Sequence, residues 1–204
     1  MTELTNIVTQ GEFRIDKLAY AICPPESFDM QLFNNDESAR FSTLIAPRRK
    51  CEFYYTRVLW NKVGNGETIN YNSLGMPVVK GTNISISHSG TEIIIGQHIA
   101  RPIGVDIEMY HEKVLRISDK FLSSTEIERF GNTDLCTLTA IWSAKESFFK
   151  LFCDEHLKFA EQMEIMQLEP NPSAKIKHLT MPKSHDFSIK TFEKFVITYC
   201  ILRD

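Results

Sequence analysis

The chain has 204 residues, of which 43% are apolar and 24% charged, and its formal charge is −3 at neutral pH. This length and balance predict a globular protein of one large domain or two small ones. The acidic excess argues against bulk nucleic-acid binding, which usually needs a basic surplus, but it leaves room for a local basic pocket.

The chain carries five cysteines, an odd number, and no two of them stand in a C-x-x-C spacing. This pattern favours reduced, mostly buried thiols in a cytosolic protein over a disulfide framework or a zinc site. Residues 1–12 contain acids and no apolar run, unlike a signal peptide, and no segment approaches the length of a membrane span. We therefore expect a cytoplasmic protein without a membrane partner.

The first third of the chain predicts one strand and two helices. Residues 13–23 alternate loosely and predict an early strand. Asn35 and Asp36 can cap a helix over residues 37–45. Pro47 suits the first position of a second helix that runs to residue 63 and stops at a glycine.

The second helix carries a group of basic side chains. Arg49, Phe53 and Arg57 are spaced by four and share one face. Near a helix start, the free N–H groups add to the attraction for an anion, so one interpretation is a phosphate-binding cluster. The other is a solvated face with an Arg48–Glu52 ion pair at i, i+4. From the spacing alone, the solvated face is favoured.

Residues 83–90 follow a turn-rich stretch and predict a strand with clean parity. Ser85 and Ser87 fall on one face, and the isoleucines between them on the other. His88 ends the apolar row at a turn, where a lone histidine is more often structural than catalytic. Residues 92–98 predict a buried strand that leads to residues 103–108, so we expect these three strands to form an antiparallel meander.

The strand over residues 103–108 has two different faces. Ile103, Val105 and Ile107 share an apolar one, and Gly104, Asp106 and Glu108 share the other. Two acids at this spacing, about 7 Å apart at the α-carbons, repel each other unless water or a cation screens them. Gly104 would leave the approach to them open. Taken alone, the pattern also suits an ordinary strand with one solvated face and no chemistry.

The second half of the chain predicts mixed helices and strands. We expect a polar loop over residues 110–119 and a helix start near residues 121–126, capped by Ser123 or Ser124. A long helix capped by Asn132 or Thr133 runs to about residue 152 and carries an apolar stripe. Strands are expected over residues 164–168, 187–191 and 195–202.

Trp142, Glu146 and Lys150 lie one above another on the long helix, at i, i+4 spacing. One interpretation is a surface Glu–Lys pair worth about 0.2–0.5 kcal/mol. The other is a third carboxylate and a cation that are aimed at Asp106 and Glu108.

Three blocks in order carry a resemblance to a known family. They are Ser87-His88-Ser89, then Gly104-Val105-Asp106-Ile107-Glu108, then the stretch from Trp142 to Lys150 with Lys145-Glu146 inside it. Together they resemble the signature of 4′-phosphopantetheinyl transferases, in the longer class that activates peptide synthetases and related carrier proteins. Arg49 to Phe53, followed by Arg57, resembles a further basic motif of that class.

The resemblance implies a fold and a reaction. The fold is α+β, with two similar α/β halves that have antiparallel sheets and are related by a pseudo-twofold axis, here residues 1–100 and 101–204. Coenzyme A would lie between the halves. The reaction moves the 4′-phosphopantetheine arm of coenzyme A to a serine of an apo acyl or peptidyl carrier protein and releases adenosine 3′,5′-bisphosphate. The expected protein is a monomer that binds no nucleic acid.

The resemblance also implies residue roles in the second half. Asp106, Glu108 and Glu146 would hold Mg²⁺, or alternatively Mn²⁺, since oxygen-only ligands suit these cations. Glu146 or a metal-bound water would be the base, and Asp106, Glu146 and Lys150 form the catalytic set. Lys150 and Lys145 would screen the phosphates of coenzyme A.

In the first half, the implied coenzyme A ligands are Arg49 and Arg57 for the 3′-phosphate, and Gly75, Pro77, Ser87 and His88 near the nucleotide. Relatives often have a lysine where this chain has Met76, which places one phosphate contact in doubt. Two other functions remain open: a non-catalytic protein that binds carrier or coenzyme A, and a Mg²⁺-dependent hydrolase of pyrophosphate bonds. Incubation with coenzyme A, with and without an apo-carrier, separates the three.

Overall fold

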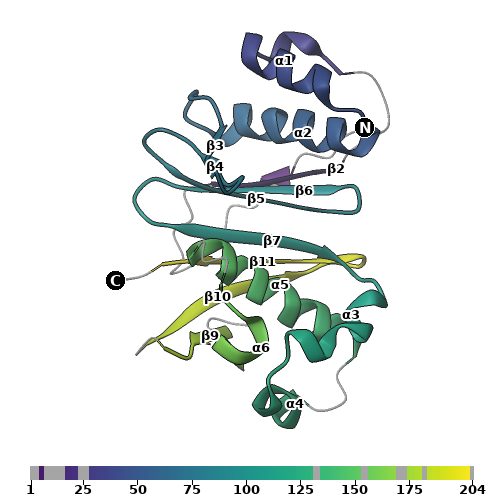
Figure 1. The fold of residues 1–204 in the computed structure, drawn as a ribbon, viewed down its shortest axis with the longest axis vertical. Helices are drawn as coiled ribbons and strands as arrows, with labels where there is room; N and C mark the ends of the chain where they lie inside the picture. Colours follow the sequence, from purple (N-terminus) through teal and green to yellow (C-terminus); the bar gives the residue numbers. More distant parts are fainter. Residues whose placement is uncertain are drawn as a thin grey trace. The chain divides into compact units, whose positions relative to one another are not determined.

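The computed structural model describes residues 5–6, 17–22, 28–130, 134–152, 156–168, 174–180 and 183–202. The chain forms two compact units, residues 1–100 and 101–204. In each unit a long helix packs on an antiparallel sheet (Figure 1). The fold is therefore α+β, as the family resemblance implies.

Two helices follow the 3₁₀ turn η1 (Met30–Leu32) in the first unit. Helix α1 (Asn35–Thr43) starts with a capping box, in which the Asn34 side chain accepts from the backbone N–H of Glu37 and the Glu37 carboxylate accepts from that of Asn34. The cap is thus one residue earlier than predicted. Helix α2 (Pro47–Val63) has the predicted bounds, with proline at a position where its missing N–H has no intrahelical partner to lose.

The sheet of the first unit has the strand order β1-β2-β6-β5. Its strands are β1 (Thr5–Asn6), β2 (Lys17–Ile22), β5 (Asn83–Ser89) and β6 (Glu92–His98). Helix α2 packs on β6 and β2, with Leu59 and Trp60 buried against Ile93 and Ile95. A separate two-stranded ribbon joins β3 (Asn70–Tyr71) and β4 (Pro77–Val78) beside β5.

The sheet of the second unit has the order β7-β11-β10-β9-β8. Its strands are β7 (Ile103–Met109), β8 (Met163–Gln167), β9 (Ala174–His178), β10 (Ser184–Thr191) and β11 (Phe195–Ile201). The predicted meander is wrong at β7, because β7 pairs along its whole length with β11 and belongs to this second sheet. A fully buried run near the end of the sequence supplies that partner.

The helices of the second unit are α3 (Lys113–Arg116), the 3₁₀ turn η2 (Ser118–Lys120), α4 (Ser124–Phe130), α5 (Leu135–Phe152) and α6 (Phe159–Gln162). The loop expected over residues 110–119 therefore contains two helical turns, and Val114 of α3 is buried. Helix α5 packs on β7 and β11 (Figure 1). Its residues Ile141, Ala144 and Phe148 are fully buried in the core of this unit.

Helices α4 and α5 begin with different N-terminal caps. Ser123, one of the two predicted caps, forms a capping box with Glu126 at α4. At α5 the capping carboxylate belongs to Asp134, which accepts from the backbone N–H of Thr137. The predicted caps Asn132 and Thr133 lie outside the described residues.

The cysteines agree only in part with the expectation of reduced, mostly buried thiols. Cys136 is a free, exposed thiol and Cys200 is a free, buried one. Cys51 is disulfide-bonded, so the expectation of reduced cysteines is wrong at this position. Within the described residues, none of the helices has both the length and the apolar content that a bilayer crossing requires.

Candidate functional site

The strand β7 lies in unusually close contact with α5. A methyl group placed on Gly104 would lie 1.8 Å from the backbone oxygen of Ser147, so only glycine fits there. Asp106, on the same face, is only 2% exposed. The expectation of a solvated face is therefore wrong, because α5 covers it. The glycine brings α5 against the strand that carries the acids.

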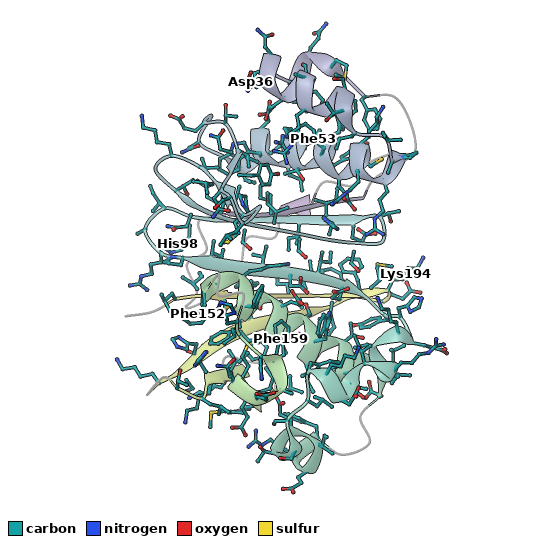
Figure 2. The ribbon with its side chains drawn as sticks, viewed as in Figure 1. Asp36, Phe53, His98, Phe152, Phe159 and Lys194 are labelled. Carbon is teal, nitrogen blue, oxygen red and sulfur yellow. The ribbon has the colours of Figure 1, made fainter. Side chains whose placement is uncertain are left out.

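Side chains of α5 reach both acids of β7. Lys150 Nζ lies 2.7 Å from Asp106 Oδ1 and 3.2 Å from the backbone oxygen of Val105. Trp142 Nε1 donates to Glu108 Oε1 at 3.0 Å. The indole of Trp142 packs against the ring of Phe159, 5.3 Å away, and Figure 2 shows that ring beside α5. The ion pair of Lys150 thus joins the helix to β7.

Glu146 lies between Trp142 and Lys150 on this face of the helix, and its protonation is perturbed. Partial burial and the charges of Asp106 and Glu108 raise the pKa of Glu146, Lys150 opposes them, and the resulting pKa is about 7. The side chain is therefore close to half protonated near neutral pH. A carboxyl in this state can accept or donate a proton, as a general base or acid requires.

Asp106, Glu108 and Glu146 are the residues that could hold a metal. In the part of the chain that the structure describes, no group of three or more His, Cys, Asp or Glu side chains is arranged as a ready metal site. The donor chemistry nevertheless fits a hard divalent cation, because all three groups offer carboxylate oxygens. The repulsion that raises the pKa of Glu146 also favours a bound cation.

A second candidate site is a pocket of about 440 Å³ in the first unit. It is formed by α1, α2, the β3–β4 ribbon and β5, and its lining residues are Arg40, Leu44, Arg49, Glu52, Phe53, Thr56, Tyr71, Gly75, Pro77, Ile86 and His88. Four of the predicted coenzyme A ligands meet here: Arg49, Gly75, Pro77 and His88. Gly75 has a φ of 77°, which favours glycine in this turn.

Glu52 connects the basic groups of this pocket. Its Oε1 lies 2.8 Å from Arg48 Nε and 3.3 Å from His88 Nδ1, and its Oε2 lies 3.1 Å from Arg49 Nη1. Burial acts to raise the pKa of Glu52, but the hydrogen bonds from Arg48 and Arg49 and the charge of His88 outweigh it and leave the pKa lowered. Glu52 is therefore ionised at neutral pH, and the Arg48–Glu52 pair expected from the spacing is present.

Two predicted ligands of the first unit lie outside this pocket. The side chain of Arg57 is 5% exposed, pairs with Glu37 at 3.0 Å and stacks 3.7 Å from the centroid of the Phe53 ring. Figure 2 shows Phe53 between α1 and α2, so Arg57 joins these two helices. Ser87 is buried and points to the face of β5 opposite His88, since neighbouring strand residues alternate.

Lys145 also lies away from the place predicted for it. Its side chain is 0% exposed and forms an ion pair with Glu126 at 2.7 Å. Its Nζ is also within 2.6–3.1 Å of the backbone oxygens of Phe121, Phe159 and Met163. This placement argues against a contact with phosphates and points to a structural role.

Sequence reasoning missed Arg40 and Tyr71. The guanidinium of Arg40 lies 4.3 Å from the centroid of the Tyr71 ring, and both side chains line the pocket. The available signal was weak, since Arg40 lies in the first helix, outside the basic motif. Its approach to the pocket depends on the packing of α1 on α2, which local sequence does not specify.

Comparisons with known proteins agree with the motif blocks. Residues 102–200 match the family described as the 4′-phosphopantetheinyl transferase superfamily. The chain is also 27% identical over 144 residues to the 4′-phosphopantetheinyl transferase Sfp of Bacillus subtilis (strain 168). That match covers 57% of this chain and 64% of the relative, which is less than two thirds of the relative's length.

Proposed function

We propose that the chain is a member of the 4′-phosphopantetheinyl transferase superfamily, and that it moves the 4′-phosphopantetheine group of coenzyme A to a serine of an apo acyl or peptidyl carrier protein. The observation that carries the proposal is the cluster in the second unit, in which Glu146 has a pKa of about 7 beside the Asp106–Lys150 ion pair. A transferase of this kind needs a base for a hydroxyl and positive charge for a pyrophosphate.

In the proposed reaction, Glu146 takes the proton of the carrier serine hydroxyl. The serine oxygen forms a bond to the phosphorus that bears the pantetheine arm, and the bond from this phosphorus to the bridging oxygen breaks. Adenosine 3′,5′-bisphosphate leaves with the electron pair. Lys150, whose side chain is 25% exposed, can turn from Asp106 towards the departing phosphate and offset its charge.

Mg²⁺ is the cation that fits this proposal best. Asp106, Glu108 and Glu146 would hold it, and it would neutralise the pyrophosphate and polarise the phosphorus that is attacked. In the metal-free protein, Lys150 supplies the positive charge that Asp106 requires. The acids and Lys150 together are a charge set suited to a bound phosphate ester with its cation.

We assign the pocket of the first unit to the nucleotide end of coenzyme A. Arg40, Arg49 and His88 line it and would bind the 3′-phosphate, since guanidinium groups suit phosphate geometry. Gly75 and Pro77 shape the turn at its edge. Arg57 and Lys145 are excluded from this role by their burial and ion pairs.

The proposal is tested by measuring nucleotide release from coenzyme A by chromatography, with and without an apo-carrier. A transferase releases adenosine 3′,5′-bisphosphate only when the carrier is present. Release without carrier would indicate a hydrolase of the pyrophosphate bond. Binding of coenzyme A with no release in either case would indicate a non-catalytic protein.

A further inference from the structure

Glu52 is an unexpected group in a pocket for phosphate, because a carboxylate repels an anion. It lines the pocket, is ionised, and its side chain is 11% exposed. A simple charge count predicts that Glu52 weakens phosphate binding, so that its removal would tighten it.

The contacts of Glu52 indicate a different role. Both of its oxygens are engaged by basic side chains, Oε1 by Arg48 and His88 and Oε2 by Arg49. Two guanidinium groups therefore offset its charge locally, and Arg40 adds a further positive charge to the pocket. An incoming phosphate would meet a net positive surface even with Glu52 ionised.

These contacts leave the basic groups able to bind a ligand. Arg49 reaches Glu52 through Nη1, and a guanidinium has five N–H donors in a planar fork, so the same side chain can bind a phosphate at the same time. His88 faces Glu52 with Nδ1, so this contact fixes which edge of the imidazole ring is turned to the carboxylate. The side chain of Arg49 is 66% exposed, so without a tether it would have wide rotamer freedom to lose on binding.

We propose that Glu52 is a positioning residue, which orients Arg49 and His88 for the 3′-phosphate of the nucleotide before the ligand arrives. This inference rests on the proposed function, because it takes the pocket to be the 3′-phosphate site. In this role Glu52 strengthens the binding of a phosphate, whereas the simple charge count predicts that Glu52 weakens it.

The test is calorimetric binding of adenosine 3′,5′-bisphosphate and adenosine 5′-monophosphate to the full chain. Glu52→Gln should weaken binding of the bisphosphate by about tenfold, since two side chains lose their orientation, and should change binding of the monophosphate little. Glu52→Asp keeps the charge but shortens the reach, and it should weaken the bisphosphate by a similar factor. Thermal unfolding of each variant shows that it is folded.

The matched control is Glu67→Gln, which removes the same charge from an exposed residue of the first unit that lies outside the pocket. It should bind both nucleotides as the wild type does. Unchanged or tighter bisphosphate binding in Glu52→Gln, with the wild type preferring the bisphosphate, would overturn the role of Glu52 alone.

A wild type without preference for the bisphosphate would overturn the pocket assignment and this inference together. A wild type that keeps the preference but transfers nothing to any carrier would count against the transferase proposal. In that case the binding results for Glu52→Gln and Glu52→Asp still decide the role of Glu52.

Discussion

Glu146 is poised between its charged and neutral forms near pH 7, because it is partly buried beside two other acids. Its neighbour in sequence, Lys145, is fully buried in an ion pair on another face of the same helix. Adjacent residues of one motif thus have separate tasks: one faces the candidate site and the other holds the helix.

The first prediction concerns the turnover of Glu146→Gln. Glutamine keeps the size of the side chain but cannot accept a proton at neutral pH, and a positioned base contributes about 10²–10⁴-fold in rate. We expect carrier modification to slow by that factor. Steady-state kinetics with coenzyme A and one apo-carrier measure it, and turnover near the wild-type value would remove Glu146 from the chemistry.

The second prediction concerns the pH dependence of stability in the metal-free protein. The pKa of Glu146 is raised to about 7 in the folded state, so its stabilising proton is fully bound below the unfolded pKa and is lost as pH rises through about 7. Glu146→Gln should therefore be more stable than the wild type at pH 8, by up to about 3 kcal/mol, and similar to it at pH 4. Denaturant unfolding at both pH values tests this, and equal stability at pH 8 would contradict the raised pKa.

The third prediction separates two arginines of the first unit. Arg40 lines the pocket, whereas Arg57 is buried against Glu37 and Phe53. Arg40→Ala should weaken binding of coenzyme A more than that of dephospho-coenzyme A, which lacks the 3′-phosphate. Arg57→Ala should lower the free energy of unfolding by about 3 kcal/mol, because a buried ion pair loses one partner. Calorimetry measures nucleotide binding, and denaturant unfolding measures stability. If Arg57→Ala weakened coenzyme A selectively and Arg40→Ala only lowered stability, the assignment of the two arginines would be contradicted.

At the scale of elements, the second unit depends on how closely α5 approaches β7. Gly104 permits this approach, and the Lys145–Glu126 ion pair ties α5 to α4. Glu126 also accepts from the backbone N–H groups of Ser123 and Ile165, so it links α4 to β8 as well. These contacts hold the helix that presents Glu146 and Lys150.

The fourth prediction concerns Gly104→Ala. The added methyl group would lie 1.8 Å from the Ser147 backbone oxygen, so α5 must move away from β7. We expect lower stability of the second unit and a large loss of transfer, because Lys150 would no longer reach Asp106. Thermal unfolding and activity of this variant test the claim, and a fully active, equally stable variant would contradict the close packing.

Sequence patterns predicted well the features that arise from local spacing. The bounds of α2, the alternation of β5 and the helix cap at Ser123 depend on neighbouring residues, and the structure has them. Long-range pairing was missed, because the partner of β7 is a strand about 90 residues later in the chain, and local alternation does not identify partners.

The same distinction applies to the candidate sites. The basic motif singled out Arg49, which lines the pocket, but it could not separate Arg49 from Arg57, which shares its helix face. Burial decides between them, and burial of Arg57 depends on the packing of α1 on α2. Lys145 was assigned to the phosphates from its place in the motif, and its full burial in an ion pair with Glu126 likewise depends on packing that the motif does not specify.

At the scale of the whole molecule, the two units carry different parts of the proposed function. The pocket that lies in the first unit has the chemistry for a phosphate ester, and the acids of the second unit have the chemistry for proton transfer and for a cation. Changes in the pocket should therefore act on coenzyme A affinity, and changes in the acids on turnover.

The fifth prediction follows from this division. Excess chelator should abolish transfer, and added Mg²⁺ should restore it, since the acids of the second unit would lose their cation. Binding of adenosine 3′,5′-bisphosphate to the pocket should persist in chelator, because Arg40, Arg49 and His88 need no metal. Activity assays and calorimetry in the same buffer measure both, and full transfer in chelator would remove the metal from the mechanism.

The most direct test of the account is intact-mass analysis of several apo-carrier proteins after incubation with this protein, coenzyme A and Mg²⁺. We predict that at least one carrier gains the mass of one phosphopantetheine group, and that a carrier with its acceptor serine changed to alanine gains none. Unmodified carriers throughout, or an equal mass gain on the carrier without the serine, would contradict the assignment of this protein as a phosphopantetheinyl transferase.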